Sequence, residues 1–122
     1  PHGAQKLLGW FGGYGFSGTM EAMSMSLPGP IVFLVIIGEF FAPVLLLTGF
    51  ATRFAAASVA LIMAGAAILV HLQNGFFMNW FGGQAGEGIE FHVLAITIAV
   101  TLVLKGAGST SVDLRLTNRD PQ

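Results

Sequence analysis

Ile31-Val-Phe-Leu-Val-Ile-Ile-Gly-Glu39-Phe-Phe-Ala-Pro-Val-Leu-Leu-Leu-Thr-Gly-Phe50 is a run of 20 residues in which Glu39 carries the only charge. A run of about 20 apolar residues is long enough to cross the hydrocarbon core of a bilayer as one helix. A carboxylate at that depth costs roughly 2.5–3.5 kcal/mol on insertion scales, so it is expected to face other helices, stay protonated or pair. The segment therefore predicts a membrane protein in which a neighbouring group satisfies Glu39.

The composition extends this interpretation to the whole chain. Of 122 residues, 54% are hydrophobic and 9% are charged, whereas soluble domains carry about 25% charged residues. The net charge of −1 provides no basic surface for nucleic acid, so no nucleic-acid partner is expected. Because the sequence has no cysteine, thiol relays and cysteine-ligated iron–sulfur clusters are excluded within it.

The expected fold class is all-α, a transmembrane helical bundle of the four-span type, because open sheets cannot satisfy their backbone in lipid. The chain is expected to form a single domain over residues 1–122, with full spans at about residues 30–52, 54–72 and 87–104. The sequence begins at Pro1 without a methionine. We therefore expect residues 1–10 to be the end of a further span, with the first helix largely missing from this chain. Residues 106–122 are expected to form a tail.

Basic residues predict the orientation of these spans. Arg53 lies in the turn between the first two full spans, and Lys105, Arg115 and Arg119 follow the last one. Cytoplasmic loops of membrane proteins carry an excess of Lys and Arg. This face, and with it the C-terminus, is therefore expected to be cytoplasmic.

A second set of polar residues is expected near the opposite membrane boundary: His2, Gln5, Lys6, His71, Glu87, Glu90 and His92. Glu87 and Glu90 are three residues apart, which would place them on one helix face. We expect Lys6 to pair with Glu87 or Glu90 across helices, because pairing offsets the cost of both charges.

Several chemistries fit these polar residues. A quinone head group needs hydrogen-bond donors beside apolar walls, and quinone is therefore the leading candidate cofactor. No metal site is expected, because the Glu-x-x-His spacing of di-iron bundles is absent. Haem ligation by His71 and a second His is a weaker alternative, and ordinary interfacial hydrogen bonding needs no ligand at all.

Glu39 itself has two interpretations. It is either a proton-handling group or a protonated structural carboxyl beside a kink, because Pro43 removes the helical hydrogen bond to the Glu39 carbonyl. The two interpretations are left open at this point.

Six segments together resemble the DoxX family of small four-helix bacterial membrane proteins. They are His2-Gly-Ala-Gln-Lys6-Leu-Leu-Gly-Trp-Phe-Gly-Gly13, Glu39-Phe-Phe41, Leu47-Thr-Gly-Phe-Ala-Thr-Arg53, Val70-His71-Leu-Gln-Asn-Gly75-Phe-Phe, Gly88-Ile-Glu90-Phe-His92, and Gly106-Ala-Gly108-Ser-Thr-Ser-Val-Asp113. The resemblance implies a four-span bundle in the bacterial inner membrane with both termini in the cytoplasm. Some members of the family are linked to thiosulfate:quinone oxidoreduction and others to membrane redox complexes, and no residue role is transferred from them.

These observations lead to two main functional hypotheses. The first is an integral inner-membrane subunit associated with a quinone-linked redox or electron-transfer system, such as a respiratory or photosynthetic complex. The alternative is a non-enzymatic accessory or scaffold subunit of a larger membrane complex. Both imply lipid and other membrane protein subunits as partners. A third, minor hypothesis is a small transporter with a polar path along Glu90, Thr97 and Thr101.

Overall fold

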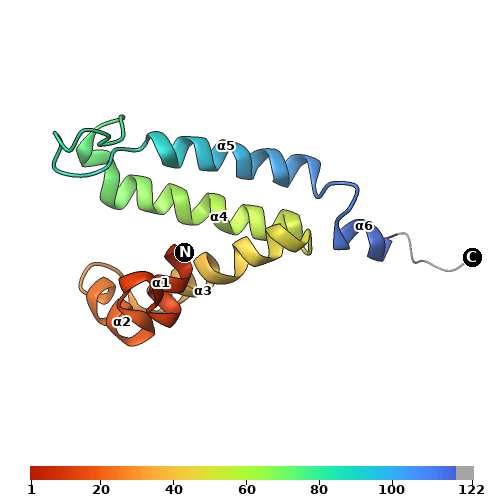
Figure 1. Ribbon diagram of the computed structural model, residues 1–122, viewed down its shortest axis with the longest axis horizontal. Coiled ribbons are helices and arrows are strands. Elements are labelled where there is room, and N and C mark those ends of the chain that lie inside the picture. Colours follow the sequence, from red (N-terminus) through yellow and green to blue (C-terminus); the bar gives the residue numbers. More distant parts are fainter. Residues whose placement is uncertain (118–122) are drawn as a thin grey trace, which may run out of the picture.

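The computed structural model describes residues 1–117, and all of the regular structure in that range is helical (Figure 1). The six α-helices are α1 (His2–Leu8), α2 (Gly15–Ser24), α3 (Gly29–Thr48), α4 (Thr52–Ala66), α5 (Glu90–Lys105) and α6 (Val112–Thr117). Three short segments complete the described chain: the 3₁₀ turns η1 (Trp10–Gly12) and η3 (Leu72–Asn74) and the π-helical segment η2 (Ala67–His71). The prediction of an all-α fold is confirmed.

Local sequence signals set the limits of α3. Pro30 lies in its first turn, where a missing N–H costs nothing, and Gly49 ends the helix with a φ of 67°. A helix of 20 residues is about 30 Å long, which matches the hydrocarbon core of a bilayer.

Two helices are long and apolar enough to cross a membrane by length and composition, Gly29–Thr48 and the continuous stretch Thr52–Asn74. Only 17% of the most apolar window of each is buried inside the protein. The core helix of a soluble protein would be buried to a much larger extent, so these apolar faces fit contact with lipid. α5 has 16 residues and is shorter.

α3 is the central helix of the bundle. It contacts α1 and α2 on one side and α4 on the other, and α4 in turn packs along α5 (Figure 1). A Cβ atom on Gly38 would overlap the side chain of Ile62, so the glycine permits close packing of α3 on α4. The buried apolar residues are few and mostly small: Val32, Ile36, Ala42, Ala55, Ala56 and Ala99.

The short helix α6 is held against the turn between α3 and α4. The carboxylate of Asp113 accepts hydrogen bonds from the backbone N–H groups of Ala51 (2.7 Å) and Thr52 (2.9 Å), and its own N–H donates to the carbonyl of Gly49 (2.9 Å). Asp113 thereby caps the start of α4 from a distant part of the sequence. The Thr52 N–H, with a further contribution from the Ala51 N–H, lowers the pKa of Asp113 against the opposing effect of burial.

Two expectations about the C-terminal half need comment. α5 begins at Glu90, and Glu87 lies in the preceding loop, so the prediction that Glu87 and Glu90 share a helix face is wrong. Gly86 and Gly88 flank Glu87 and favour a loop there. Of the expected tail, residues 118–122, including Arg119, lie outside the described residues.

Candidate functional site

Lys6 on α1 forms an ion pair with Glu39 at the middle of α3. Lys6 Nζ lies 2.5 Å from Glu39 Oε1, and the two side chains are 30% and 13% exposed. The expectation that a neighbouring group satisfies Glu39 is confirmed for one carboxylate oxygen, Oε1. The prediction that Lys6 pairs with Glu87 or Glu90 is wrong, because α1 packs beside α3 and places Lys6 next to the centre of that helix.

Gly3 makes this pairing possible. It is buried, and a Cβ atom there would overlap the backbone carbonyl of Glu39. Gly3 and Lys6 are three residues apart, so they share one face of α1. The backbone of α1 therefore reaches α3 at the carbonyl that Pro43 leaves without its helical donor, and Lys6 on the same face meets the Glu39 carboxylate.

The second oxygen of the Glu39 carboxylate has a different environment. Oε2 is buried and has no hydrogen-bond partner among residues 1–117. A buried polar atom without a partner is unfavourable and is rare in folded proteins. With Oε1 bound to Lys6, Oε2 is the oxygen of this carboxylate that lacks a partner within the described residues.

A cavity of about 330 Å³ adjoins the ion pair between α1, η1 and α2. Its lining residues are Gln5, Lys6, Gly12, Gly13, Tyr14, Thr19, Ala22 and Met23. This volume falls at the lower end of the range of small-molecule sites, roughly 300–1,000 Å³. A lysine ammonium has three donors, and within the described chain Lys6 uses one of them on Glu39. Its other donors remain for a ligand.

Gln5 and His2 support the wall of this cavity. His2 Nδ1–H donates to Gln5 Oε1 (3.0 Å), and Gln5 Nε2–H donates to the carbonyl of Phe11 (3.2 Å). The backbone at Gly13 lies so close to Gln5 that a Cβ atom on Gly13 would overlap the Gln5 carbonyl. Gln5 therefore holds the turn after α1, which closes one side of the cavity.

The remaining predicted residues form a second, separate group, which we call the boundary group: His71, Glu87, Glu90 and His92. The carboxylates of this group accept hydrogen bonds from backbone N–H groups. Glu87 accepts from the N–H of Asn79 (2.6 Å) and Glu90 from the N–H of Met78 (3.1 Å). Both bonds fix the loop of residues 75–89, and a structural role explains them fully.

The two histidines of the boundary group lie against each other. The ring centroids of His71 and His92 are 4.3 Å apart at 38°, and His71 Nδ1–H donates to the carbonyl of Glu87 (2.8 Å). His71 ends the π-helical segment. His92 is only 7% exposed, and its Nδ1 has no partner in the described part of the chain.

The predicted polar residues therefore lie at two different levels along the helices. Glu39 lies ten residues after the start of α3 at Gly29, about 15 Å along the helix, whereas His71 and Glu90 lie at helix ends. Within residues 1–117, no hydrogen bond or ion pair joins the boundary group to the Lys6–Glu39 pair. The same residues contain no group of three His, Asp or Glu side chains able to hold a metal ion.

Sequence reasoning missed Gly3 and the cavity residues Tyr14 and Thr19. The spacing of Gly3 and Lys6 on one helix face is a usable signal for a close helix contact with an adjacent charge. Tyr14 and Thr19 follow a glycine-rich turn, and nothing in their spacing indicates a cavity.

Comparison with known families decides what kind of chain this is. The model of the DoxX family matches residues 1–72. The chain belongs to the DoxX family. Both partners of the Lys6–Glu39 pair lie inside the matched region of this DoxX protein, and Glu87, Glu90 and His92 lie outside it. No curated protein and no solved structure matches the chain. Family membership and the two apolar helices identify a helical membrane protein.

Proposed function

We propose that this DoxX-family protein is a multi-pass subunit of the bacterial inner membrane that works with a quinone-linked redox system. The head group of a quinone would bind beside Lys6 and Glu39. The observation that carries the proposal is an ion pair at mid-span that adjoins a cavity of about 330 Å³. Charged groups at such depth are costly, and by default they indicate a functional site.

The donors and walls of this cavity suit a quinone head group. Quinone oxygens accept hydrogen bonds, and Lys6 keeps donors that Glu39 does not use. Ala22 and Met23 supply apolar wall, and Tyr14 supplies an aromatic ring. A bound quinone would supply electron and proton uptake, with electrons delivered by a partner oxidoreductase. The role of this chain is to orient the head group through Lys6 and to hold a proton at Glu39 Oε2.

The proposed orientation places the C-terminus in the cytoplasm. Arg53 and Lys105 line one cavity at the same end of the bundle, and the positive-inside rule assigns such an end to the cytoplasm. The Lys6–Glu39 pair then lies near the membrane centre. Fusing a reporter that is active only in the cytoplasm to the C-terminus tests this orientation.

Mass spectrometry of protein purified from native membranes in mild detergent tests the proposed function. Both the co-purifying proteins and the extracted lipids should be analysed. We expect quinone with the wild-type chain, less quinone with Lys6→Met, and wild-type amounts with Lys105→Met, which removes the same charge far from the cavity. Equal quinone in all three samples, or none in any, would exclude this site.

A second candidate function is that of a non-enzymatic accessory subunit, favoured by the loop of residues 75–89. This loop is held by backbone hydrogen bonds from Gly88, Ile89 and Glu90 to the carbonyls of residues 75–77, and it presents exposed aromatic rings, among them Trp80 at 74% exposure. Aromatic residues are enriched in protein interfaces. Trp80→Ala should then lower the yield of a co-purifying partner while leaving the fold intact.

A further inference from the structure

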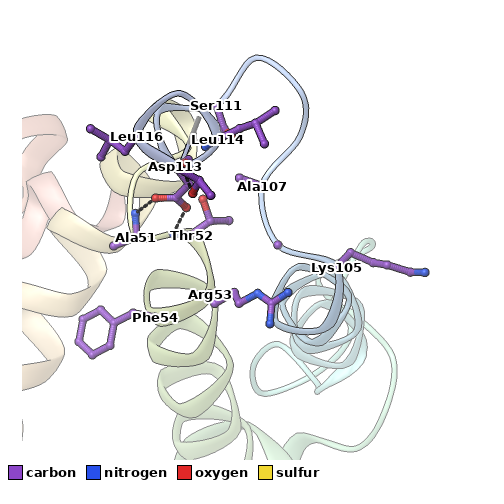
Figure 2. Close-up of a pocket in the computed structure, with 12 residues that line it drawn as sticks. Ala51, Thr52, Arg53, Phe54, Lys105, Ala107, Ser111, Asp113, Leu114 and Leu116 are labelled. Carbon is purple, nitrogen blue, oxygen red and sulfur yellow. Dashed lines mark hydrogen bonds between the residues drawn. The ribbon is translucent and has the colours of Figure 1, made fainter. Parts of the chain in front are cut away.

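A larger cavity lies at the other end of α4 and α5 from the boundary group. It has a volume of about 570 Å³ and is enclosed by the start of α4, the end of α5 and α6 (Figure 2). Arg53, Lys105, Gly106, Asp113 and Leu114 are among its lining residues. Neither the ion pair nor the cavity of the proposed quinone site includes any of them.

The charges of this cavity do not balance. Neither Arg53 nor Lys105 has a salt bridge to another described residue. The carboxylate of Asp113 also lines the cavity, but each of its oxygens already accepts a backbone N–H at the start of α4. Two cations less one carboxylate leave a net charge of +1 on the lining, and the cationic groups are the ones with free donors.

Packing directs Arg53 toward the end of α5. A Cβ atom on Gly106 would lie 3.3 Å from Arg53 Nε, so the guanidinium runs close beside this glycine. Figure 2 shows Arg53 extending from α4 toward α5 while the Asp113 carboxylate turns to Ala51 and Thr52. The planar fork of Arg is well suited to two parallel hydrogen bonds with a phosphate.

The position of the cavity fits a lipid headgroup. Thr52–Asn74 is one of the two stretches apolar enough to cross a membrane, and Arg53 lies in its first turn, at one end of that stretch. Phe54 and Leu104 at this end of α4 and α5 are 72% and 70% exposed, and Phe54 extends from the side of α4 opposite to Arg53 (Figure 2). Cations at the end of an exposed apolar surface fit a molecule with a phosphate at one end and acyl chains at the other.

We propose that this cavity binds the phosphate of an anionic phospholipid, with Arg53 as its hydrogen-bonding ligand and Lys105 as a second positive charge at its rim. In Figure 2 the Lys105 side chain extends away from Arg53, so Lys105 contributes by its charge. The acyl chains would run along the exposed apolar surface of α4 and α5. A soluble phosphate shares the headgroup chemistry, but it would gain nothing from that apolar surface.

Native mass spectrometry of the full chain with added phosphatidylglycerol or phosphatidylcholine tests this proposal. Wild-type protein should retain phosphatidylglycerol in preference to phosphatidylcholine. Retention of phosphatidylglycerol should fall roughly five-fold for each cation removed in Arg53→Gln and Lys105→Gln. Arg115→Gln is the matched control, because Arg115 lies on α6 outside the cavity lining, and it should leave retention close to that of wild type.

Three results would overturn the proposal. They are equal retention of both lipids by wild type, unchanged retention in a double variant that combines Arg53→Gln with Lys105→Gln, or displacement of phosphatidylglycerol by millimolar inorganic phosphate, which would indicate a soluble anion. If the double variant fails to fold, Lys105→Gln alone carries the test, since within residues 1–117 the Lys105 side chain makes no hydrogen bond or salt bridge.

Discussion

Lys6 Nζ and Glu39 Oε1, which are 33 residues apart in sequence, lie 2.5 Å from each other at the middle of α3. Charges in a membrane are expensive, and removing one partner leaves the other uncompensated. The pair therefore fixes the position of α1 on α3. Lys6, the other member of the pair, lines the neighbouring cavity.

Removing Lys6 should destabilise the protein strongly. We expect Lys6→Met to lower the free energy of unfolding by roughly 3–5 kcal/mol, because a buried charge loses its partner. The double variant Lys6→Met with Glu39→Leu should recover most of that loss, since an apolar pair leaves no charge in lipid. Unfolding in mixed detergent micelles measures both values. Glu21→Gln, which neutralises an exposed carboxylate on α2, should change stability by less than about 0.5 kcal/mol.

Substitution of Gly3 tests whether the ion pair depends on close packing of α1. Gly3→Ala introduces a Cβ atom that overlaps the Glu39 backbone, so α1 should separate from α3 and the thermal midpoint should fall. The matched control is Gly65→Ala on α4, where a Cβ atom meets nothing within 4 Å. That change should be neutral or stabilise by up to about 1 kcal/mol through helix propensity. Equal effects of the two substitutions would contradict the proposed contact.

The Asp113 cap predicts a specific dependence of stability on pH. Its pKa is lowered in the folded protein, chiefly by the Thr52 N–H. The cap therefore stabilises fully above the unfolded pKa of about 3.9, and this contribution is lost as the pH falls through the folded value. Asp113→Asn should be less stable than wild type at pH 6, and the difference should shrink toward pH 2. A difference that is constant with pH in thermal unfolding would argue against the cap.

The two histidines of the boundary group should respond differently to substitution. His71→Ala removes the donor to the Glu87 carbonyl, so amide hydrogen exchange should rise across residues 75–89. His92→Leu removes a buried nitrogen without a partner among the described residues and should leave stability unchanged or raise it by up to about 1 kcal/mol. Loss of stability in His92→Leu would show that Nδ1 has a partner that matters.

The sequence was most informative about α3 and least informative about how deep each polar residue lies along the spans. Apolar length predicts the span, and the glycine and proline at its ends predict its limits. Glu39 required a partner, but the spacing could not name Lys6, because only folding back of the chain after α1 brings that lysine to mid-span. Gly86 and Gly88 predict a loop at Glu87. This signal is stronger than the helical signal of the three-residue spacing between Glu87 and Glu90.

The cavities could not be predicted at all. Each is enclosed by elements that are distant in sequence or joined by irregular turns, and their shapes depend on the packing angles of α2 and α6. The charged residues that line them were visible in the sequence. In the sequence, Arg53 indicates only the orientation of the spans, since its closeness to Gly106 requires the α4–α5 hairpin.

Binding of decylubiquinone to protein in nanodiscs, corrected for uptake by empty nanodiscs, shows whether a quinone site exists at Lys6 and Glu39. We predict saturable binding by wild type, a loss of roughly ten-fold or more in affinity for Lys6→Met because a charged donor is removed, and wild-type affinity for Glu21→Gln. The same affinity in Lys6→Met and wild type, or no saturable binding by folded wild-type protein, would contradict a quinone site at Lys6 and Glu39.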